Sequence, residues 1–133
     1  MTLAPRLAPY GDRAYALLRI VAGFAFSLHG WQKMFGLLGG QRPPFGTQMW
    51  FGGAIELVCG TLILAGLFTR GAAFLASGTM AVAYLQFHWK LAFGAGFFPV
   101  VNKGELALLY CFLFFYMVFR GSGPWSLDAR RAA

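Results

Sequence analysis

The 133-residue sequence has few charged side chains. Asp and Glu together number four and Lys and Arg eleven, so charged residues make up 11% of the chain, whereas hydrophobic residues make up 59%. Soluble domains carry about 25% charged residues, which cover their water-facing surface. With a mean hydropathy of +0.62, the composition excludes an ordinary soluble domain and favours an integral membrane protein.

Cysteine and histidine are also scarce, with two residues of each. Cys59 and Cys111 lie inside apolar runs, and the sequence has no CxxC pair, zinc-ligand spacing or disulfide framework. We therefore expect two buried thiols that behave as small hydrophobic side chains, and we expect no metal site.

The basic residues outnumber the acidic ones, which gives a formal net charge of +7. They occur singly between apolar runs rather than in Lys/Arg-rich stretches, and this spacing argues against nucleic-acid binding. Isolated basic residues at helix ends are typical of membrane proteins, in which they orient the chain and contact anionic headgroups. The lipid bilayer is therefore the expected partner.

Four apolar runs are long enough to cross a bilayer, which takes about 20 residues of helix. They cover about residues 14–35, 49–68, 71–90 and 104–120. The predicted fold class is therefore all-α: a single membrane domain over residues 1–133, built as an up-down-up-down four-helix bundle. The "TRG" segment, residues 69–71, is expected to turn the chain between the second and third helices.

The basic residues are divided unevenly between the two ends of this expected bundle. The terminal end, which holds both termini, carries Arg6, Arg13, Arg70, Arg120, Arg130 and Arg131, and the opposite loop end carries Lys33, Arg42, Lys90 and Lys103. Because basic residues accumulate on the cytoplasmic side of a membrane, this distribution predicts cytoplasmic termini. The loop end would then lie in the outer leaflet.

Each expected helix brings polar side chains to the loop end. In chain order they are His29, Lys33, Glu56, Gln86, His88, Lys90, Asn102, Lys103 and Glu105. An unpaired charge inside a bilayer costs about 2.5–3.5 kcal/mol, so Glu56 is expected to face the bundle and to pair with His29 or Lys33. The expected partners of Glu105 are the lysines of the same end: Lys33, Lys90 or Lys103.

Arg19 lies toward the other end of the first helix. A rise of about 1.5 Å per residue separates it from Glu56 by roughly 12 Å or more along the bundle. Its possible partners are Asp128 from a folded-back tail, backbone carbonyl groups, or lipid phosphate reached by snorkelling.

The two halves of the chain are weakly similar to each other. "HGWQK" is followed by a Pro- and Phe-containing loop and "GGAIEL", and "HWK" is followed by a similar loop and "NKGEL". A two-helix internal repeat about an axis along the membrane normal would produce this pattern. Chance similarity is the alternative for so short a match.

Four motifs follow one another along the chain: "LRIVAGFAFSLHGWQKMFG", "GGAIELVCGTLILAGLFTR", "NKGELALLY" and "GSGPWSLD". In this order they resemble the DoxX family, over about residues 15–128. By position, Arg19, His29, Gly30 and Lys33 match the first family motif, Glu56 and Arg70 the second, and Glu105 the third. The resemblance implies a multi-pass protein of the bacterial inner membrane. It extends to the membrane subunit of an archaeal thiosulfate:quinone oxidoreductase, and some relatives are linked to quinone or oxidative stress.

The leading functional hypothesis is a quinone site at the loop end, in a membrane subunit or accessory protein of an oxidoreductase. Glu56 and Glu105 are the candidate proton relay, because intramembrane carboxylates often carry protons. The candidate quinone-binding residues are His29, Lys33, Trp31, Arg19 and His88. Catalysis by this chain alone is not expected, because it has no nucleotide motif, flavin fingerprint or metal cluster.

Several alternatives stay open. The polar residues would also serve to hold four helices together in a non-catalytic scaffold or anchor. His29 and His88 would complete a pair of axial haem ligands. The Arg-rich tail "LDARRAA" would dock a soluble oxidoreductase or contact lipid. Transport of a small solute would require a homo-oligomer, because four helices leave little room for a pore.

Overall fold

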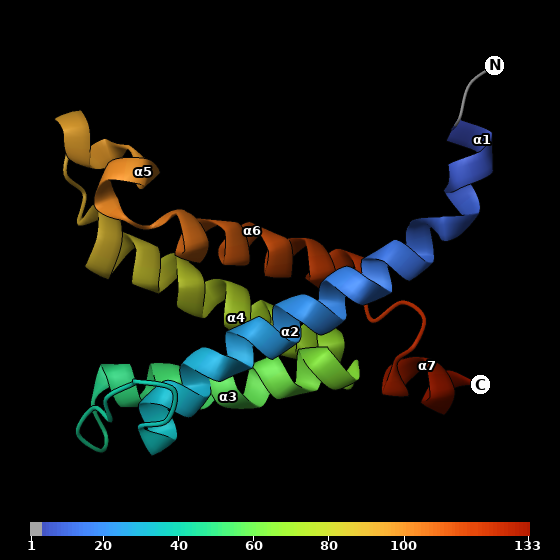
Figure 1. Ribbon diagram of the computed structural model, residues 1–133, viewed down its shortest axis with the longest axis horizontal. Coiled ribbons are helices and arrows are strands. Elements are labelled where there is room, and N and C mark those ends of the chain that lie inside the picture. Colours follow the sequence, from blue (N-terminus) through green and yellow to red (C-terminus); the bar gives the residue numbers. More distant parts are fainter. Residues whose placement is uncertain (1–3) are drawn as a thin grey trace.

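The computed structural model describes residues 4–133, which form helices and connecting loops without a strand among them (Figure 1). The four long helices are α2 (Gly11–Phe35), α3 (Gln48–Ala65), α4 (Thr69–Ala83) and α6 (Glu105–Arg120). The shorter elements are α1 (Ala4–Leu7), η1 (Ala8–Tyr10), η2 (Tyr84–Trp89), η3 (Gly94–Phe97), α5 (Pro99–Asn102) and α7 (Leu127–Ala132). The predicted all-helical class is therefore confirmed, and each long helix coincides with one of the four apolar runs.

Helix α4 continues into η2, which is π-helical. The residue at the junction, Tyr84, has right-handed helical dihedral angles (φ −62°, ψ −49°), so the chain stays helical from residue 69 to residue 89. π-Helical turns are frequent at functional sites because they shift the side chains that follow them around the helix axis. His88 lies in this turn.

The turn between α3 and α4 lies three residues earlier than the sequence predicts. Gly66 adopts a left-handed conformation (φ 68°), which glycine reaches without strain. The N–H groups of Gly66 and Leu67 then donate to the carbonyl oxygens of Ile63 and Leu62, at 3.1 and 2.9 Å, and close the end of α3. The "TRG" segment is the first turn of α4, so the prediction that it forms the connection is wrong.

Helices α2 and α3 pack closely and run antiparallel. Gly30 lies against the backbone of Leu57, and Gly23 lies against the backbone of Leu64. A Cβ atom built on Gly30 would be 2.3 Å from the Leu57 backbone nitrogen, so a larger residue cannot fit there. Small residues therefore set the distance between these two backbones.

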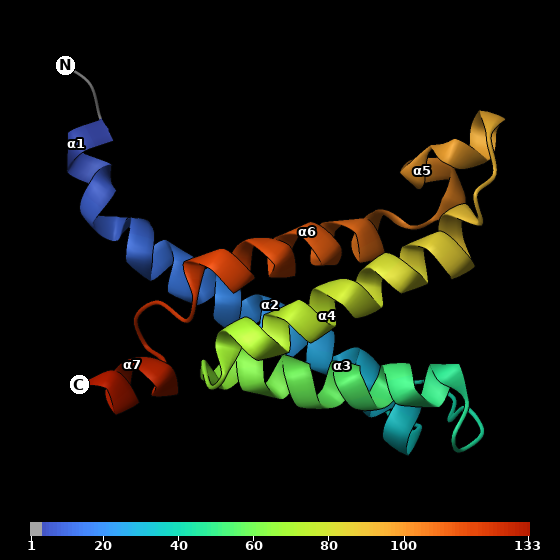
Figure 2. The same ribbon diagram turned by 180° about the vertical axis from the view of Figure 1, so that it is seen from behind.

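Helices α4 and α6 form the second antiparallel pair. The Ser77 hydroxyl donates to the Cys111 carbonyl oxygen at 2.8 Å, and Arg70 donates to the Phe119 carbonyl oxygen at 2.7 Å. The two pairs meet at an aromatic core in which the ring centroids of Phe26 and Phe114 are 4.8 Å apart. From there the pairs diverge toward the loop end (Figures 1 and 2).

Arg19 is fully buried where α2 meets the end of α3 and the C-terminal tail. Its Nη1 donates to the carbonyl oxygens of Ile63 and Leu64, at 2.8 and 2.9 Å. Its Nη2 donates to those of Pro124 and Trp125, at 3.3 and 2.7 Å. Of the three kinds of partner that the sequence leaves open, backbone carbonyl groups are therefore the correct one.

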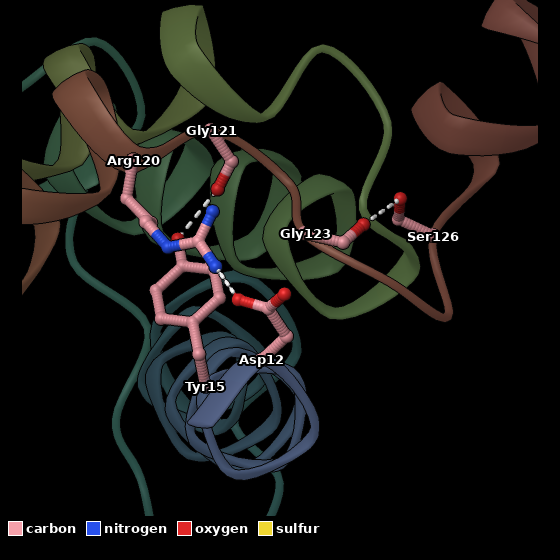
Figure 3. Close-up of polar contacts among 6 residues, drawn as sticks. All are labelled: Asp12, Tyr15, Arg120, Gly121, Gly123 and Ser126. Carbon is pink, nitrogen blue, oxygen red and sulfur yellow. Dashed lines mark hydrogen bonds and ion pairs between the residues drawn. The ribbon is translucent and has the colours of Figure 1, made fainter. Parts of the chain in front are cut away.

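A second set of contacts joins α2 to the end of α6 (Figure 3). Arg120 forms an ion pair with Asp12, and its guanidinium lies 4.9 Å from the ring centroid of Tyr15. The Tyr15 hydroxyl donates to the Gly121 carbonyl oxygen. These contacts hold the beginning of the first long helix against the end of the last one.

The C-terminal tail folds back onto the α3–α4 turn. The Asp128 N–H donates to the Gly66 carbonyl oxygen at 2.8 Å. Its carboxylate accepts from the N–H groups of Phe68 and Thr69, at 2.9 and 3.0 Å, and so caps the beginning of α4. Burial raises the pKa of the Asp128 carboxyl, but the hydrogen bonds from Thr69 and Phe68 outweigh it, so this pKa lies below its ordinary value.

We predict that docking of the tail weakens in acid. A lowered pKa in the folded state means that Asp128 stabilises the fold above the pKa of an unfolded aspartate, about 3.9, and that this stability is lost as the pH falls through the folded-state value. Amide hydrogen exchange over residues 121–133, corrected for intrinsic rates, should therefore accelerate on acidification. Asp128→Asn should exchange fast at every pH, whereas Glu105→Gln at the loop end should follow the parent. An equal acid response in Asp128→Asn would contradict the prediction.

Two charged side chains are buried beside the apolar core, whereas many large apolar side chains face outward. Arg19 and Glu56 are buried, whereas Leu109, Phe112 and Phe119 on the outer face of α6 are each about two-thirds exposed. Over the described residues, one helix, α3, has both the length and the apolarity to cross a membrane, with a mean hydropathy of 1.4 over 18 residues. The apolar side chains that face outward belong to several helices of differing length.

Candidate functional site

A cavity of about 760 Å³ lies toward the loop end of the structure. Residues of α2, α3, α4, η2 and α6 line it. Its polar side chains are His29, Lys33, Gln48, Glu56, Thr79, His88, Lys103 and Tyr110, and the remaining lining is apolar. A few polar groups within a largely apolar wall are typical of sites that bind small organic molecules.

Glu56 is the buried charge of this cavity. It is 3% exposed, and its Oε1 lies 2.7 Å from the Lys33 Nζ. Gly53 allows this pair to form, because a Cβ atom at that position would lie 2.7 Å from the Lys33 Cβ. The structure therefore confirms the predicted ion pair and selects Lys33 over His29 as the partner.

Within residues 4–133 the second carboxylate oxygen of Glu56, Oε2, is buried and has no hydrogen-bond partner. Buried polar atoms are nearly always bonded, so such an atom requires an explanation. Glu56 lines the cavity, so a small shift of its side chain would let this oxygen accept a hydrogen bond from a hydroxyl or N–H group in the cavity.

His29 and Tyr110 form an aromatic contact in the cavity wall. His29 is half-buried on α2, and its ring lies edge-on to that of Tyr110 with the centroids 6.4 Å apart. Tyr110 is buried on α6 and stacks on Phe114 at 5.4 Å. Both rings are thereby held in place beside the Glu56–Lys33 pair.

His88 enters the cavity from the π-helical turn. Its Nδ1 lies 3.4 Å from the Asn102 carbonyl oxygen. Asn102 in turn donates to the Tyr84 hydroxyl at 3.3 Å and to the Gly96 carbonyl oxygen at 3.1 Å. This network orients the imidazole and anchors the loop between η2 and α6.

Three of the predicted site residues lie outside the cavity lining. Arg19 is at the terminal end, and its two terminal nitrogens are occupied by carbonyl groups. Trp31 is 42% exposed and packs on Phe35. Glu105 is exposed at the start of α6 and forms no ion pair within residues 4–133, so its expected pairing with a lysine is not found.

The two halves of the chain also differ at this site. Glu56 is buried and paired, whereas Glu105, its counterpart in the repeated pattern, is exposed and unpaired within the described residues. The internal repeat therefore stays a prediction, and any symmetry between the halves does not extend to the chemistry of these two carboxylates.

Sequence reasoning missed Tyr110 and Gln48 as cavity residues. Tyr110 lies within an apolar run that gives no polar signal, although its position five residues after Glu105 places it deeper in the same helix. Gln48 begins α3, and its Nε2 donates to the Gln86 Oε1 of η2 at 2.6 Å. A polar residue at a helix start is too common to identify a site.

Comparison with known proteins gives two matches. A family model described as DoxX matches residues 14–89, which is more than half of the chain. An uncharacterized protein of Haemophilus influenzae is 43% identical over 126 residues, covering 92% of this chain and 93% of that protein. No solved structure matches the chain. Because the family model covers α2, α3, α4 and η2, more than half of the chain, the chain belongs to the DoxX family.

Proposed function

We propose that this chain is a four-span protein of the bacterial inner membrane that binds a quinone in its loop-end cavity. In this proposal the helices run up-down-up-down, the termini are cytoplasmic, and the protein serves an oxidoreductase system as a membrane subunit or accessory protein. The single observation that carries the quinone site is the buried Glu56–Lys33 pair in the cavity wall, in which the second carboxylate oxygen has no partner among the described residues.

Membrane insertion is supported by the many large apolar side chains that face outward. Apolar residues cover the outside, and charged groups inside are paired or hydrogen-bonded, as lipid requires. At about 1.5 Å per residue, α2 is about 37 Å long and the continuous helix from residue 69 to 89 is about 31 Å long, which matches a hydrocarbon core of about 30 Å. The uneven distribution of arginine supports the orientation.

The cavity suits a quinone because it offers groups for both redox states of the ring. A quinone carbonyl accepts hydrogen bonds, and Lys33 and His29 can donate them. A quinol hydroxyl donates, and the carboxylate of Glu56 can accept that bond. When a partner enzyme supplies two electrons, the quinone also takes up two protons to become the quinol, and Glu56 is the group placed to relay them. The sequence shows no redox motif, so the electrons would come from a partner enzyme that reaches the loop end.

Glu56→Leu is expected to weaken binding of duroquinol by about 10–100-fold, which corresponds to the loss of one hydrogen bond to a charged group. Glu56→Gln keeps an acceptor for Lys33 but cannot take a proton, so it should bind duroquinone nearly as the parent does and bind duroquinol more weakly. Titration of purified protein in detergent, followed by tryptophan fluorescence or chemical shifts, measures both.

Asp12→Asn is the matched control for this titration. It removes a carboxylate at the opposite end of the molecule, where Asp12 pairs with Arg120, and it should leave both affinities unchanged. If the parent binds neither duroquinone nor duroquinol, or if Glu56→Leu binds both as the parent does, the proposed site is wrong.

A haem site is the second candidate function, and one observation favours it: His29 and His88 line the same cavity from different helices. The contact between the His88 Nδ1 and a backbone carbonyl leaves its Nε2 free, as is usual for a metal-ligating histidine. Protein purified from membranes would then show a Soret band that His88→Ala removes. A spectrum without that band would exclude haem and leave quinone as the proposed ligand.

A further inference from the structure

The cavity reaches the outer surface of the structure between α3 and α4. Its lining includes residues whose side chains are also exposed on the outside of these helices: Phe51, Phe74, Leu75, Val82 and Phe87. We call this opening the α3–α4 groove. In a bilayer it would face acyl chains rather than water, so a molecule could enter the cavity sideways from the lipid.

The register of the two helices places the groove beside Glu56. Gln48 at the start of α3 is hydrogen-bonded to Gln86 near the end of the α4–η2 helix. Because the helices run antiparallel, the residues eight positions inward from this hydrogen-bonded pair, Glu56 on α3 and Gly78 on α4, lie at roughly the same level. The groove therefore leads from the outer face at Gly78 toward the buried carboxylate.

Two glycines keep the groove open. A Cβ atom built on Gly52 or on Gly78 meets nothing within 4 Å, although both residues line the cavity. This differs from Gly23 and Gly30, where the same atom would collide with the backbone of α3. Glycine inside a helix lowers stability by about 0.5–1 kcal/mol relative to alanine. At positions 52 and 78 no close contact with another helix explains why glycine is present.

The groove offers no free polar group to a ligand. Its one hydroxyl, that of Thr79, donates to the Leu75 carbonyl oxygen at 2.8 Å within its own helix. The ionisable groups collect at the inner end, where Lys33 pairs with Glu56. A groove with apolar walls that ends at one free carboxylate oxygen fits a molecule with a single polar head and a long hydrocarbon chain.

We infer that the α3–α4 groove is a lateral entrance that holds the hydrocarbon chain of the ligand while its polar head reaches Glu56. This inference rests on the proposed quinone site and specifies its ligand: a quinone with a long apolar side chain, taken from the lipid phase. Affinity then depends on the chain as well as on the ring, because burying each methylene group contributes to binding.

Gly78→Leu tests the entrance, because the new side chain fills the groove without meeting another protein atom near its Cβ. Two probes are compared: decylubiquinone, and the same dimethoxy-methyl-benzoquinone ring without the chain. Decylubiquinone should bind at least tenfold more weakly to the variant than to the parent, and the ring alone should bind equally well to both. Gly71→Leu lies on the same helix, also has open space, and is outside this cavity, so it should leave both probes unaffected.

The possible outcomes separate the two proposals. If the parent binds both probes and Gly78→Leu changes neither affinity, or weakens both equally, the groove does not hold the chain, and the quinone site itself still stands. If the parent binds neither probe, the quinone site fails. The groove is then judged by labelling with a diazirine-bearing alkyl alcohol: modification of α3 and α4 that Gly78→Leu suppresses supports an alkyl-chain groove, and equal modification in both proteins overturns it.

Discussion

Arg19→Leu is expected to lower the free energy of unfolding by about 3–5 kcal/mol, because it removes a buried charge that donates to four backbone carbonyl groups. The carbonyl oxygens at the end of α3 and in the tail would then remain buried without a donor. Arg19→Lys should recover part of the loss, since an ammonium group donates three hydrogen bonds but cannot match the geometry of the guanidinium fork.

Unfolding of the purified protein in mixed detergent micelles measures these losses. Arg13→Leu is the matched control, because Arg13 lies on the same helix but is exposed and contacts the ring of Tyr10 at its surface. It should change the stability by no more than about 0.5 kcal/mol. Equal stability of Arg19→Leu and Arg13→Leu would show that the carbonyl contacts of Arg19 do not hold the fold together.

Gly30→Ala and Gly78→Ala are expected to change stability in opposite directions. In an open helix position, alanine in place of glycine stabilises by up to about 1 kcal/mol, and the space beside Gly78 allows this gain. At Gly30 the added methyl would lie 2.3 Å from the Leu57 nitrogen, so α2 and α3 must separate. Overpacking of this kind costs about 1–3 kcal/mol, which exceeds the gain from helix propensity.

The separation would also affect the cavity, since Lys33 lies on α2 and Glu56 on α3. Gly30→Ala should therefore weaken duroquinol binding in the same titration, whereas Gly78→Ala should leave the pair intact. The same unfolding assay serves both variants. Stabilisation by Gly30→Ala would mean that α2 and α3 are not in backbone contact at this point.

The helices were predictable because length and apolarity are local properties of the chain. The burial of Glu56 and its pairing with one of two candidates were also predictable, because a charge inside an apolar helix needs a partner. The choice of Lys33 over His29 was not, because residues four apart differ only slightly in direction and the outcome depends on the small residue Gly53 across the interface. Side-chain reach across a helix pair is not a property of either helix alone.

The other differences have similar causes. The "TRG" segment contains a glycine, but the helix ends at Gly66, where a left-handed residue completes two backbone hydrogen bonds. The partners of Arg19 lie 44 to 106 positions away from it in the chain, so no local pattern indicates them. The expectation for Glu105 rested on its position at the same end of the bundle as three lysines, whereas in the structure its side chain is exposed.

The contacts of Arg19 impose an order on biosynthesis. Two of its four acceptors belong to α3 and become available as soon as the first hairpin forms, but the other two, on Pro124 and Trp125, follow α6 in the chain. Until these residues are made, the guanidinium has only half of its partners. The first long helix is thus completed by a segment that is synthesised after the other three, so native packing of α2 requires synthesis to continue past α6.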